Sequence, residues 1–541
     1  MRKGRPMNDT PDKLLICNAD IWAGAPHGKP ASSVAVRHGA IAAVGSEDDC
    51  AAALQGGFET LDLDGAALLP GFIDTHLHPA PMMYYAMNLN LEGVSSLAAL
   101  QEAYRRAAAH KKSGEWVVGL QFDENSLDRP VLLTRKDLDA ACPDRPAVAV
   151  KRDGHMIIAN TAAMRAAGVT AATPDPAGGR IDREPDGHPA GPFRETASEQ
   201  IYNHMPMPSL ESLRAGARGM VRELLSNGIV SIGAVVQTGS EGPFGDKGAF
   251  EIPLLQMLLP EIPVALYGMV LARDVNKILD LRKTPLHSTD PGGHRIGALK
   301  VYADGTYGSC TAFMNEPFAD RPDTAGFLTM QEDEMWPLML AAHKAGLQIC
   351  THAIGDRANR VVADLYRRLV REHPRADHRH RIEHASSLDA ALIADMAGAG
   401  IAAAVQPMFI HSEKAWLTGR LGAQRAAWAY PFRALLDAGV LVSGASDAPL
   451  ESLNVLHAMQ CCVTREGFHP EQNITPAQAV NMFTAHAARA QFMERERGRI
   501  EPGLRADFAV LSARPDAAPP DEIAGIKVLR TMIGGRTVFT S

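Results

Sequence analysis

Cysteine is scarce in this chain and shows no pairing pattern. The 541 residues include 7 cysteines, an odd number, and no two of them are spaced as Cys-x-x-Cys. A disulfide framework or a cysteine-type zinc site is therefore not expected. Scattered free cysteines are typical of a reducing compartment, so we expect a cytoplasmic protein.

Long hydrophobic runs and an excess of positive charge are also missing. No apolar stretch is long enough to cross a membrane, and the basic start MRKGRPMNDTPDK is not followed by the apolar region of a secretory signal. The net charge is −8, which gives no electrostatic reason to expect nucleic acid or an anionic membrane. We therefore expect a small-molecule substrate, with no nucleic acid and no membrane as partners. The sequence leaves the oligomeric state open, and a homodimer is one candidate.

The order of strand-like and helix-like segments divides the chain. Short β-like runs at both ends predict one small β domain built from residues 13–70 and 497–541, after a disordered tail at 1–12. Between them, strand and helix patterns alternate through residues 71–496. This alternation is typical of an α/β fold with parallel strands, and it predicts a (β/α)8 TIM barrel. The turn-rich stretch at about 80–220 predicts an inserted subdomain.

Side chains that can bind metals occur at the ends of separate predicted strands. His76 and His78 are two positions apart, so on a strand both point to the same face. The others lie at or near the C-terminal end of a strand, where barrel enzymes place their catalytic groups. They are Lys300 in GALKVYADG, His352 in GLQICTHA, His384 in RIEHA and Asp447 in VSGASDAP. Packing alone would rarely produce this set, so the sequence predicts a metal site.

The same segments resemble the amidohydrolase superfamily, and more closely its amidohydrolase-3 group, which includes N-substituted formamide deformylase. The matching phrases cover nearly the whole chain: PGFIDTHLHP (70–79), GEWVVGLQFDEN (114–125), DGHMIIANTAAM (153–164), ALKVYADGTYGS (298–309), THAIGDRANR (351–360), RIEHAS (381–386), SGASDAP (443–449) and EPGLRADFAVL (501–511). The stretch YADGTYGSCTA (302–312) departs from the pattern of the group, which indicates a changed pocket wall.

The resemblance implies a β-sandwich for the terminal domain and a binuclear metal centre in the barrel. It implies that His76 and His78 hold one divalent ion and that His352 and His384 hold the second. Lys300 would bridge the two ions as a carbamate formed with CO2. Imidazole and carboxylate ligands favour zinc, while manganese, iron and cobalt stay open.

The resemblance also implies that Asp447 binds the first ion. It would act as the general acid/base for a hydroxide that bridges the two metals. This implies a hydrolase that cleaves an amide or related C–N bond, as in an N-acyl or N-formyl amine. Glu383 directly precedes His384, so on a regular strand it should point to the opposite face, and we do not expect it to be a ligand.

Six further residues are candidate substrate contacts. Methionine and aromatic side chains follow several strand ends, whereas the nearest cations, Lys414 and Arg420, lie in a segment that resembles a solvated helix. We therefore predict a neutral substrate with an apolar or aromatic group. The candidate contacts are His155, Gln121, Asp123, Phe313, Met408 and Trp416.

Two alternatives remain at this level. A cyclic deaminase or imidazolone-type hydrolase of the same superfamily would use a related site, but such enzymes often lack the lysine found here as Lys300. A non-catalytic protein on the same scaffold would be expected to have lost ligands, and this chain keeps all of them. Product analysis would distinguish the first alternative from an amide hydrolase. A metal assay would distinguish the non-catalytic protein from both enzymes.

Overall fold

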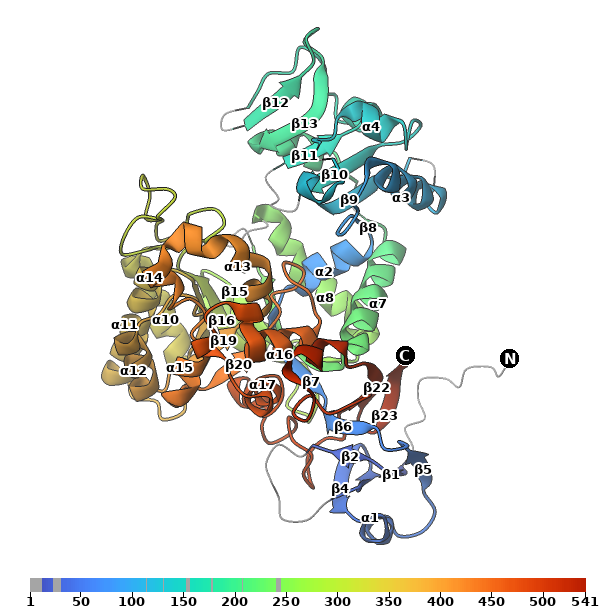
Figure 1. Cartoon of the computed structure of the whole chain (residues 1–541), viewed down its shortest axis with the longest axis vertical. Helices are drawn as coiled ribbons and strands as arrows, with labels where there is room; N and C mark the ends of the chain where they lie inside the picture. The colour runs from blue at the N-terminus through green and yellow to red at the C-terminus, as the bar shows by residue number, and fades with distance from the viewer. Residues whose placement is uncertain are drawn as a thin grey trace. The chain divides into compact units, whose positions relative to one another are not determined.

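The computed structural model describes the greater part of the chain, and its elements are labelled in Figure 1. The described residues are 12–22, 31–112, 114–129, 131–151, 156–176, 179–206, 208–239 and 245–541. Residues 1–11 of the predicted tail therefore lie outside the described residues. The chain forms two compact units, one from the described residues of Met1–Ala80 and Met220–Ser541, the other from those of Pro81–Gly219.

Eight parallel strands form the barrel of the first unit, in the order β20-β19-β18-β17-β16-β15-β14-β7. Nearly every residue of these strands is buried, as expected for strands covered on both faces. The strands are β7 (Phe72–Leu77), β14 (Ile229–Gln237), β15 (Ala265–Leu271), β16 (Arg295–Tyr302), β17 (Gln348–Ala353), β18 (Arg381–His384), β19 (Ala402–Val405) and β20 (Val442–Gly444).

Backbone hydrogen bonds between the end of β7 and the segment that follows β20 join the first and last strands of the sheet. The amide of Asp447 donates to the carbonyl of His76, and the amide of His78 donates to the carbonyl of Ala448, both at 2.8 Å. Three of the predicted metal ligands, His76, His78 and Asp447, thus belong to the hydrogen-bonded seam of the barrel.

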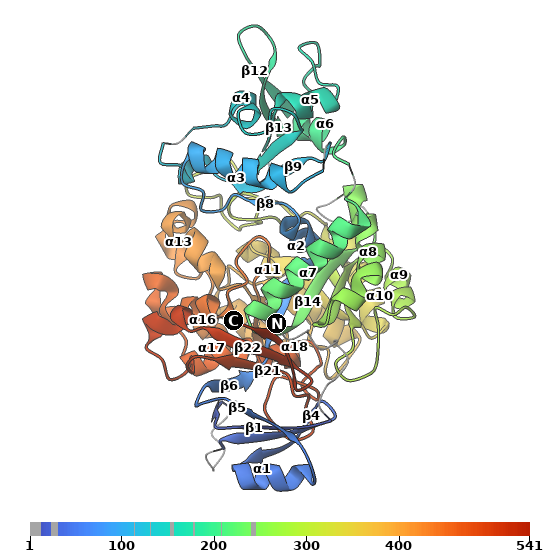
Figure 2. The same cartoon turned by 90° about the vertical axis from the view of Figure 1, so that its right-hand side faces the viewer.

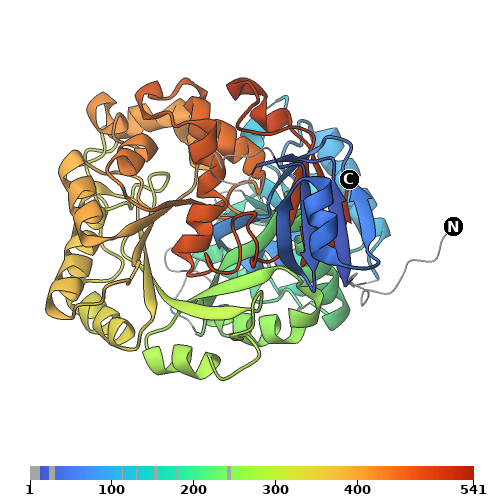
Figure 3. The same ribbon diagram turned by 90° about the horizontal axis from the view of Figure 1, so that it is seen from below.

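Helices surround the strands on the outside, as the view from below shows (Figure 3). They bury one apolar stripe each; α11, for example, buries Val362, Leu365 and Leu369. The helices are α8 (Glu251–Leu258), α9 (Val275–Leu281), α10 (Glu332–Lys344), α11 (Asp356–Glu372), α12 (Ala390–Ala399), α13 (Met408–Leu421), α14 (Ala423–Ala426), α15 (Phe432–Asp437), α16 (Val455–Thr464), α17 (Pro476–Met482) and α18 (Ala485–Ala490).

Strands from both ends of the chain form a β-sandwich in the same unit (Figure 2). One sheet has the order β4-β3-β1-β5 and the other β2-β6-β21-β22-β23. Their bounds are β1 (Lys13–Cys17), β2 (Asp20–Ile21), β3 (Ser33–Arg37), β4 (Ala40–Gly45), β5 (Glu59–Asp62), β6 (Ala67–Pro70), β21 (Phe508–Leu511), β22 (Val528–Ile533) and β23 (Arg536–Thr540).

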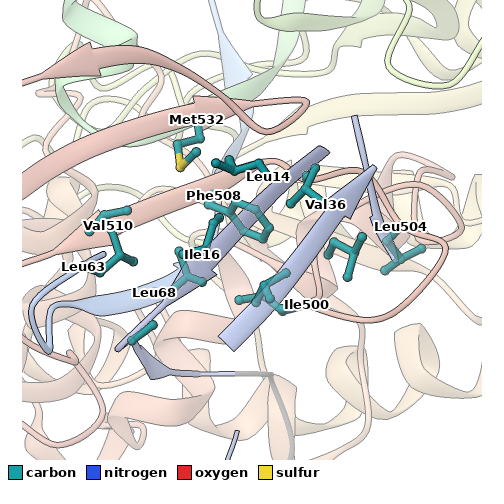
Figure 4. Packing of buried hydrophobic residues seen from close by; sticks show 14 residues of the cluster. Leu14, Ile16, Val36, Leu63, Leu68, Ile500, Leu504, Phe508, Val510 and Met532 are labelled. Carbon is teal, nitrogen blue, oxygen red and sulfur yellow. The ribbon is translucent and has the colours of Figure 1, made fainter. Parts of the chain in front are cut away.

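One hydrophobic core joins the two sheets, and its side chains point toward one another in Figure 4. Leu14 and Ile16 of β1 face this core, whereas their neighbours Leu15 and Cys17 pack on the other side of the sheet, which carries helix α1 (Glu47–Leu54). Phe508 supplies the largest apolar group from the C-terminal strands. The alternation of a strand's side chains thus separates the two cores.

The second unit is built on a six-stranded sheet in the order β12-β13-β11-β10-β9-β8. Val117 and Val118, adjacent on β9, belong to different hydrophobic clusters, so both faces of the sheet are covered. The elements are β8 (Leu89–Asn90), α3 (Leu97–Ala109), β9 (Val117–Phe122), α4 (Arg135–Asp139), β10 (Ala147–Lys151), β11 (Met156–Ala159), α5 (Thr161–Ala166), β12 (Gly179–Arg183), β13 (Pro189–Glu195) and α6 (Glu199–Tyr202). The chain passes between the units within α2 (Pro79–Ala86) and α7 (Leu210–Ser226).

This architecture confirms the predicted (β/α)8 barrel with a β-sandwich drawn from both ends of the chain and an inserted subdomain. Among the described residues, no helix combines the length and the apolar character that crossing a membrane requires.

Candidate metal centre

The six predicted ligands all lie in the first unit, at the carboxyl ends of barrel strands. His76 is in β7, and His78 follows that strand directly. Lys300, His352 and His384 lie in β16, β17 and β18, and Asp447 follows β20. All six side chains are buried. Their placement at one end of the barrel follows from the parallel direction of the strands.

Three of these side chains converge on one point. The Nε2 atoms of His76 and His78 lie 3.4 and 3.1 Å from Oδ1 of Asp447. Donor atoms of the three residues lie within 4.8 Å of one another, close enough to share a metal ion. The amine Nζ of Lys300 lies 3.4 Å from Nε2 of His76, the same nitrogen that lies near Asp447.

His352 and His384 form a second pair of imidazoles. Their ring centroids are 4.4 Å apart, and the His384 ring lies 5.2 Å from that of His76. The Nδ1 atoms of both His352 and His384 are buried and have no hydrogen-bond partner within the described part of the chain. Buried polar atoms are rarely left unpaired, and a metal ion would satisfy both. The donor set therefore fits a divalent cation here as well.

Hydrogen bonds to the other ring nitrogens assign the tautomers of two imidazoles. His352 donates from Nε2 to the carbonyl of Gly305 at 3.1 Å, which leaves the lone pair on Nδ1. Nδ1 of His76 lies 2.5 Å from the carboxylate oxygen Oε2 of Glu383, which leaves the lone pair on Nε2, the atom that faces Asp447. In each case the free lone pair is on the nitrogen that a metal would need.

The expectation that Glu383 points away from the site is wrong. Its carboxylate is buried inside the barrel and also accepts a hydrogen bond from Nε of Arg381 at 2.8 Å. The reason is local backbone geometry: His384 and Ala385 have φ values of 72° and 46°, so the chain leaves the regular strand at His384. Glu383 and His384 can therefore both face the barrel interior.

Asp304 is a second residue that sequence reasoning missed. Its carboxylate accepts backbone amides of Ile354 at 3.0 Å, Gly355 at 2.8 Å and Phe313 at 2.9 Å. Oδ1 of Asp304 also lies 3.4 Å from Nε2 of His352. Asp304 thereby fixes the loop that directly follows the strand of His352. The only signal in the sequence is an acidic residue directly after the apolar strand GALKVYADG.

Burial controls the charge state of the centre. It lowers the pKa values of His76, His352 and His384 well below the usual range, which favours the neutral imidazoles that bind metals. Burial also lowers the pKa of Lys300 to about 8. For Asp447 burial acts in the opposite sense, but the hydrogen bond from His78 and the nearby positive charges outweigh it, so the pKa is lowered.

Three of the six predicted substrate contacts, Phe313, Met408 and Trp416, lie in the same unit as the centre. Phe313 lies near the Asp304 loop, with the guanidinium of Arg357 4.5 Å from its ring. Met408 is buried at the start of α13, and its neighbour Phe409 is the residue whose ring lies 6.3 Å from that of His384. Trp416 is on α13, where the guanidinium of Arg420 lies 5.5 Å from its ring.

The other three candidates stay predictions. Gln121 and Asp123 belong to the second compact unit, so their relation to the centre remains a prediction. His155 lies outside the described residues.

A cavity of about 230 Å³ lies beside Lys300. Tyr302 and Asp304 line it, and Nζ of Lys300 lies 4.9 Å from the centre of the Tyr302 ring. Arg273, an exposed cation at the end of β15, lines it too and was not among the cations considered from the sequence. The cations that were considered have partners: Lys414 pairs with Glu466, and Arg420 pairs with Asp320.

The sequence matches the amidohydrolase family over residues 59–539. The chain belongs to the amidohydrolase family. It is 30% identical to the protein YtcJ of Bacillus subtilis over 495 residues, which cover 89% of this chain and 90% of that protein. It is 27% identical to the N-substituted formamide deformylase of Arthrobacter pascens over 538 residues, 96% of this chain and 97% of that enzyme.

The fold is also that of a solved structure, a metal-dependent hydrolase from Pyrococcus horikoshii. The TM-score is 0.76 with 23% identity, over 94% of this chain and 99% of that one. The match to the family over residues 59–539 confirms the predicted family, and this amidohydrolase is a hydrolase that acts on carbon–nitrogen bonds.

Glu383→Gln should weaken zinc binding by about 10–100-fold, because Glu383 orients His76 and raises its basicity. The measurement is zinc competition against a chromophoric chelator, on protein whose circular dichroism matches the parent. Glu372→Gln, at the exposed end of α11, is the control and should bind zinc normally. Equal zinc affinity in the parent and Glu383→Gln would show that this hydrogen bond does not tune His76.

Proposed function

We propose that the protein hydrolyses the amide bond of an N-acyl or N-formyl amine with two divalent cations, zinc being the first choice. One observation carries the proposal: five metal-competent side chains lie buried at the carboxyl ends of barrel strands, and the Nδ1 atoms of two of them, His352 and His384, are buried without a partner in the described part of the chain. Similarity over the whole chain to an enzyme named N-substituted formamide deformylase supports the substrate class.

We assign the ligands by their grouping. His76, His78 and Asp447 would hold one cation, because their donor atoms already converge. His352 and His384 would hold the other through the unpartnered nitrogens. A pair of such cations lowers the pKa of water and polarises a carbonyl oxygen.

Lys300 suits a bridging role only after modification. An ammonium has no lone pair, and a bare charge would be costly to bury. Burial lowers the pKa of Lys300 to about 8, so the neutral amine is accessible near neutral pH. The amine nitrogen would form a bond to the carbon of CO2 and release one proton, giving a carbamate whose single negative charge is shared by two oxygens.

Asp447 is the residue we assign to proton transfer. Its lowered pKa keeps the carboxylate ionised, ready to accept the proton of the attacking water. It would then give that proton to the leaving nitrogen. Oδ1 lies in hydrogen-bond range of His78, which holds the carboxylate in place.

The substrate is proposed to be neutral, with an apolar or aromatic amine part. Phe409 beside His384 supports an apolar wall, whereas Arg273 in the cavity beside Lys300 is the group that would favour a carboxylate instead. The neutral substrate is proposed because of the Phe409 ring, which lies 6.3 Å from that of His384.

Zinc-loaded protein should hydrolyse N-formyl and N-acyl benzylamines, and should prefer them to N-acyl amino acids with the same acyl group. Burial of one aromatic ring favours the neutral amide by about ten- to a hundredfold in kcat/KM. Amine release under initial-rate conditions is the measurement. A preference of similar size for the amino acid would replace our substrate by an anionic one. Ammonia release from a cyclic imine alone would favour the deaminase alternative.

Asp447→Asn should lower kcat by about 10²–10⁴-fold, because the amide cannot accept a proton as a carboxylate does. Asp437→Asn, in an exposed ion pair with Arg433, is the control and should keep the parent kcat. The measurement is the steady-state rate with zinc content determined in parallel. An unchanged kcat in Asp447→Asn would assign proton transfer to another residue.

Lys300→Ala should lose at least one zinc ion per chain, and added short carboxylic acids should restore part of the activity. Elemental analysis after desalting gives the metal content, and Lys344→Ala, an exposed lysine of α10, is the control. Full zinc content and full activity in Lys300→Ala would rule out the bridge.

A further inference from the structure

A second group of metal-competent side chains lies on helices α13 and α16 and on the turn η5 (Arg465–Gly467) that follows α16. His411 is on α13, His457 and Cys461 are on α16, and Glu466 is in η5. Donor atoms of His411, His457 and Glu466 lie within 4.8 Å of one another. None of these residues belongs to the centre described above.

The donor atoms meet at one oxygen. Oε1 of Glu466 lies 2.8 Å from Nδ1 of His411 and 3.1 Å from Nε2 of His457. The thiol Sγ of Cys461 lies 3.7 Å from the same oxygen. Ligands of a tetrahedral zinc ion are separated by about 3.3 Å for a nitrogen–oxygen pair and about 3.6 Å for a sulfur–oxygen pair. The nitrogen–oxygen and sulfur–oxygen distances are thus close to those of a zinc site, and the thiol of Cys461 would move toward the two histidines to complete the set.

The surroundings of Glu466 fit a ligating carboxylate. Its second oxygen, Oε2, pairs with Lys414, so the carboxylate is held from outside the cluster. Ligating carboxylates commonly carry such a supporting hydrogen bond. The turn is fixed as well, because Arg465 is buried and donates to the carbonyls of Tyr430 and Phe468.

The backbone of the turn is strained, and this strain also supports a ligating role for Glu466. Arg465 and Glu466 have φ values of 49° and 48°, in the left-handed region that non-glycine residues rarely adopt. This conformation directs the Glu466 carboxylate to the two histidines. Cys461 and His457 are four residues apart on α16 and hence on one face of that helix.

Charge also balances in this set. A thiolate and a carboxylate cancel the two positive charges of zinc, while both imidazoles bind as neutral groups. Binding would release the thiol proton to solvent, and the sulfur lone pair would form the bond to the metal.

Another histidine cluster in the barrel lacks these properties. His343, His378 and His380 are buried together, but every ring nitrogen is already used. His343 donates to the His373 carbonyl, His380 to His343 and His378 to the Ala399 carbonyl. The remaining nitrogens, on His380 and His378, accept backbone amides. That cluster is a satisfied structural network, whereas the donors of α13, α16 and η5 share a single oxygen.

We propose that His411, His457, Cys461 and Glu466 form a structural zinc site that fastens α13 to α16. These helices follow barrel strands β19 and β20, so the site would fix two segments that leave the catalytic end of the barrel. With four protein ligands the site is closed, as structural zinc sites are.

The test compares zinc retained per chain by the full-length parent protein and by variants, after zinc loading and desalting. His411→Ala and Glu466→Gln should each retain one zinc ion fewer than the parent. His469→Ala removes another histidine paired with a carboxylate, that of Glu471, and should match the parent. His411 has a side chain that is 49% exposed, so its removal leaves the core packing intact.

Cobalt gives a second readout that is independent of activity. The cobalt-loaded parent should show a thiolate-to-cobalt charge-transfer band in the near ultraviolet, and Cys461→Ser should lose it. The ligand set proposed for the catalytic centre contains no cysteine, so this band reports only the second site. If the catalytic assignment failed, the difference of one zinc ion between the parent and His411→Ala would persist.

Equal zinc in the parent and His411→Ala, with no thiolate band in the cobalt form, would overturn the proposal. The cluster would then be an ion-pair network around Glu466. A thermal midpoint that rises with zinc in the parent, but less in His411→Ala at equal apo stability, is the supporting result.

Discussion

The hydrogen bond between Glu383 and His76 connects β18 to β7 across the interior of the barrel. A carboxylate at this depth requires a cation, and Arg381 of the same strand supplies it while donating to the carbonyl of Thr75. The contacts from Arg381 through Glu383 to His76 therefore set the orientation of the His76 imidazole, which we propose as a metal ligand. Without it, the imidazole could present either nitrogen to the pocket.

The seam of the barrel is the second determinant of the site. The hydrogen bonds that join the end of β7 to the segment after β20 involve the backbones of His76, His78 and Asp447. The distances between these three side chains therefore depend on closure of the barrel itself. Backbone hydrogen bonds along this seam hold the three residues in place. A rigid scaffold of this kind positions functional side chains more accurately than side-chain contacts alone.

Much of this could be predicted from the sequence. Apolar strands with a polar residue at the carboxyl end are readable from the chain, so the barrel and the positions of Lys300, His352 and His384 were predictable. Glu383 was not, because the left-handed backbone at His384 overrides the alternation of a strand. Asp304 was not, because its partners are backbone amides of a distant loop. The contact of Cys461 was not, because its partner Glu466 lies in the turn after α16 and no cysteine motif marks the pair.

The β-sandwich places both ends of the chain in one sheet, since β6 pairs with β21 in antiparallel register. During synthesis, the apolar faces of β1 and β3 therefore emerge long before Phe508 and Met532 are available to cover them. Until the last strands leave the ribosome, these faces stay open to solvent or to other chains. Contacts between such distant residues also form slowly, because the loop they close is long. A nascent chain of this architecture thus depends on chaperones or on rapid completion of the barrel to avoid aggregation.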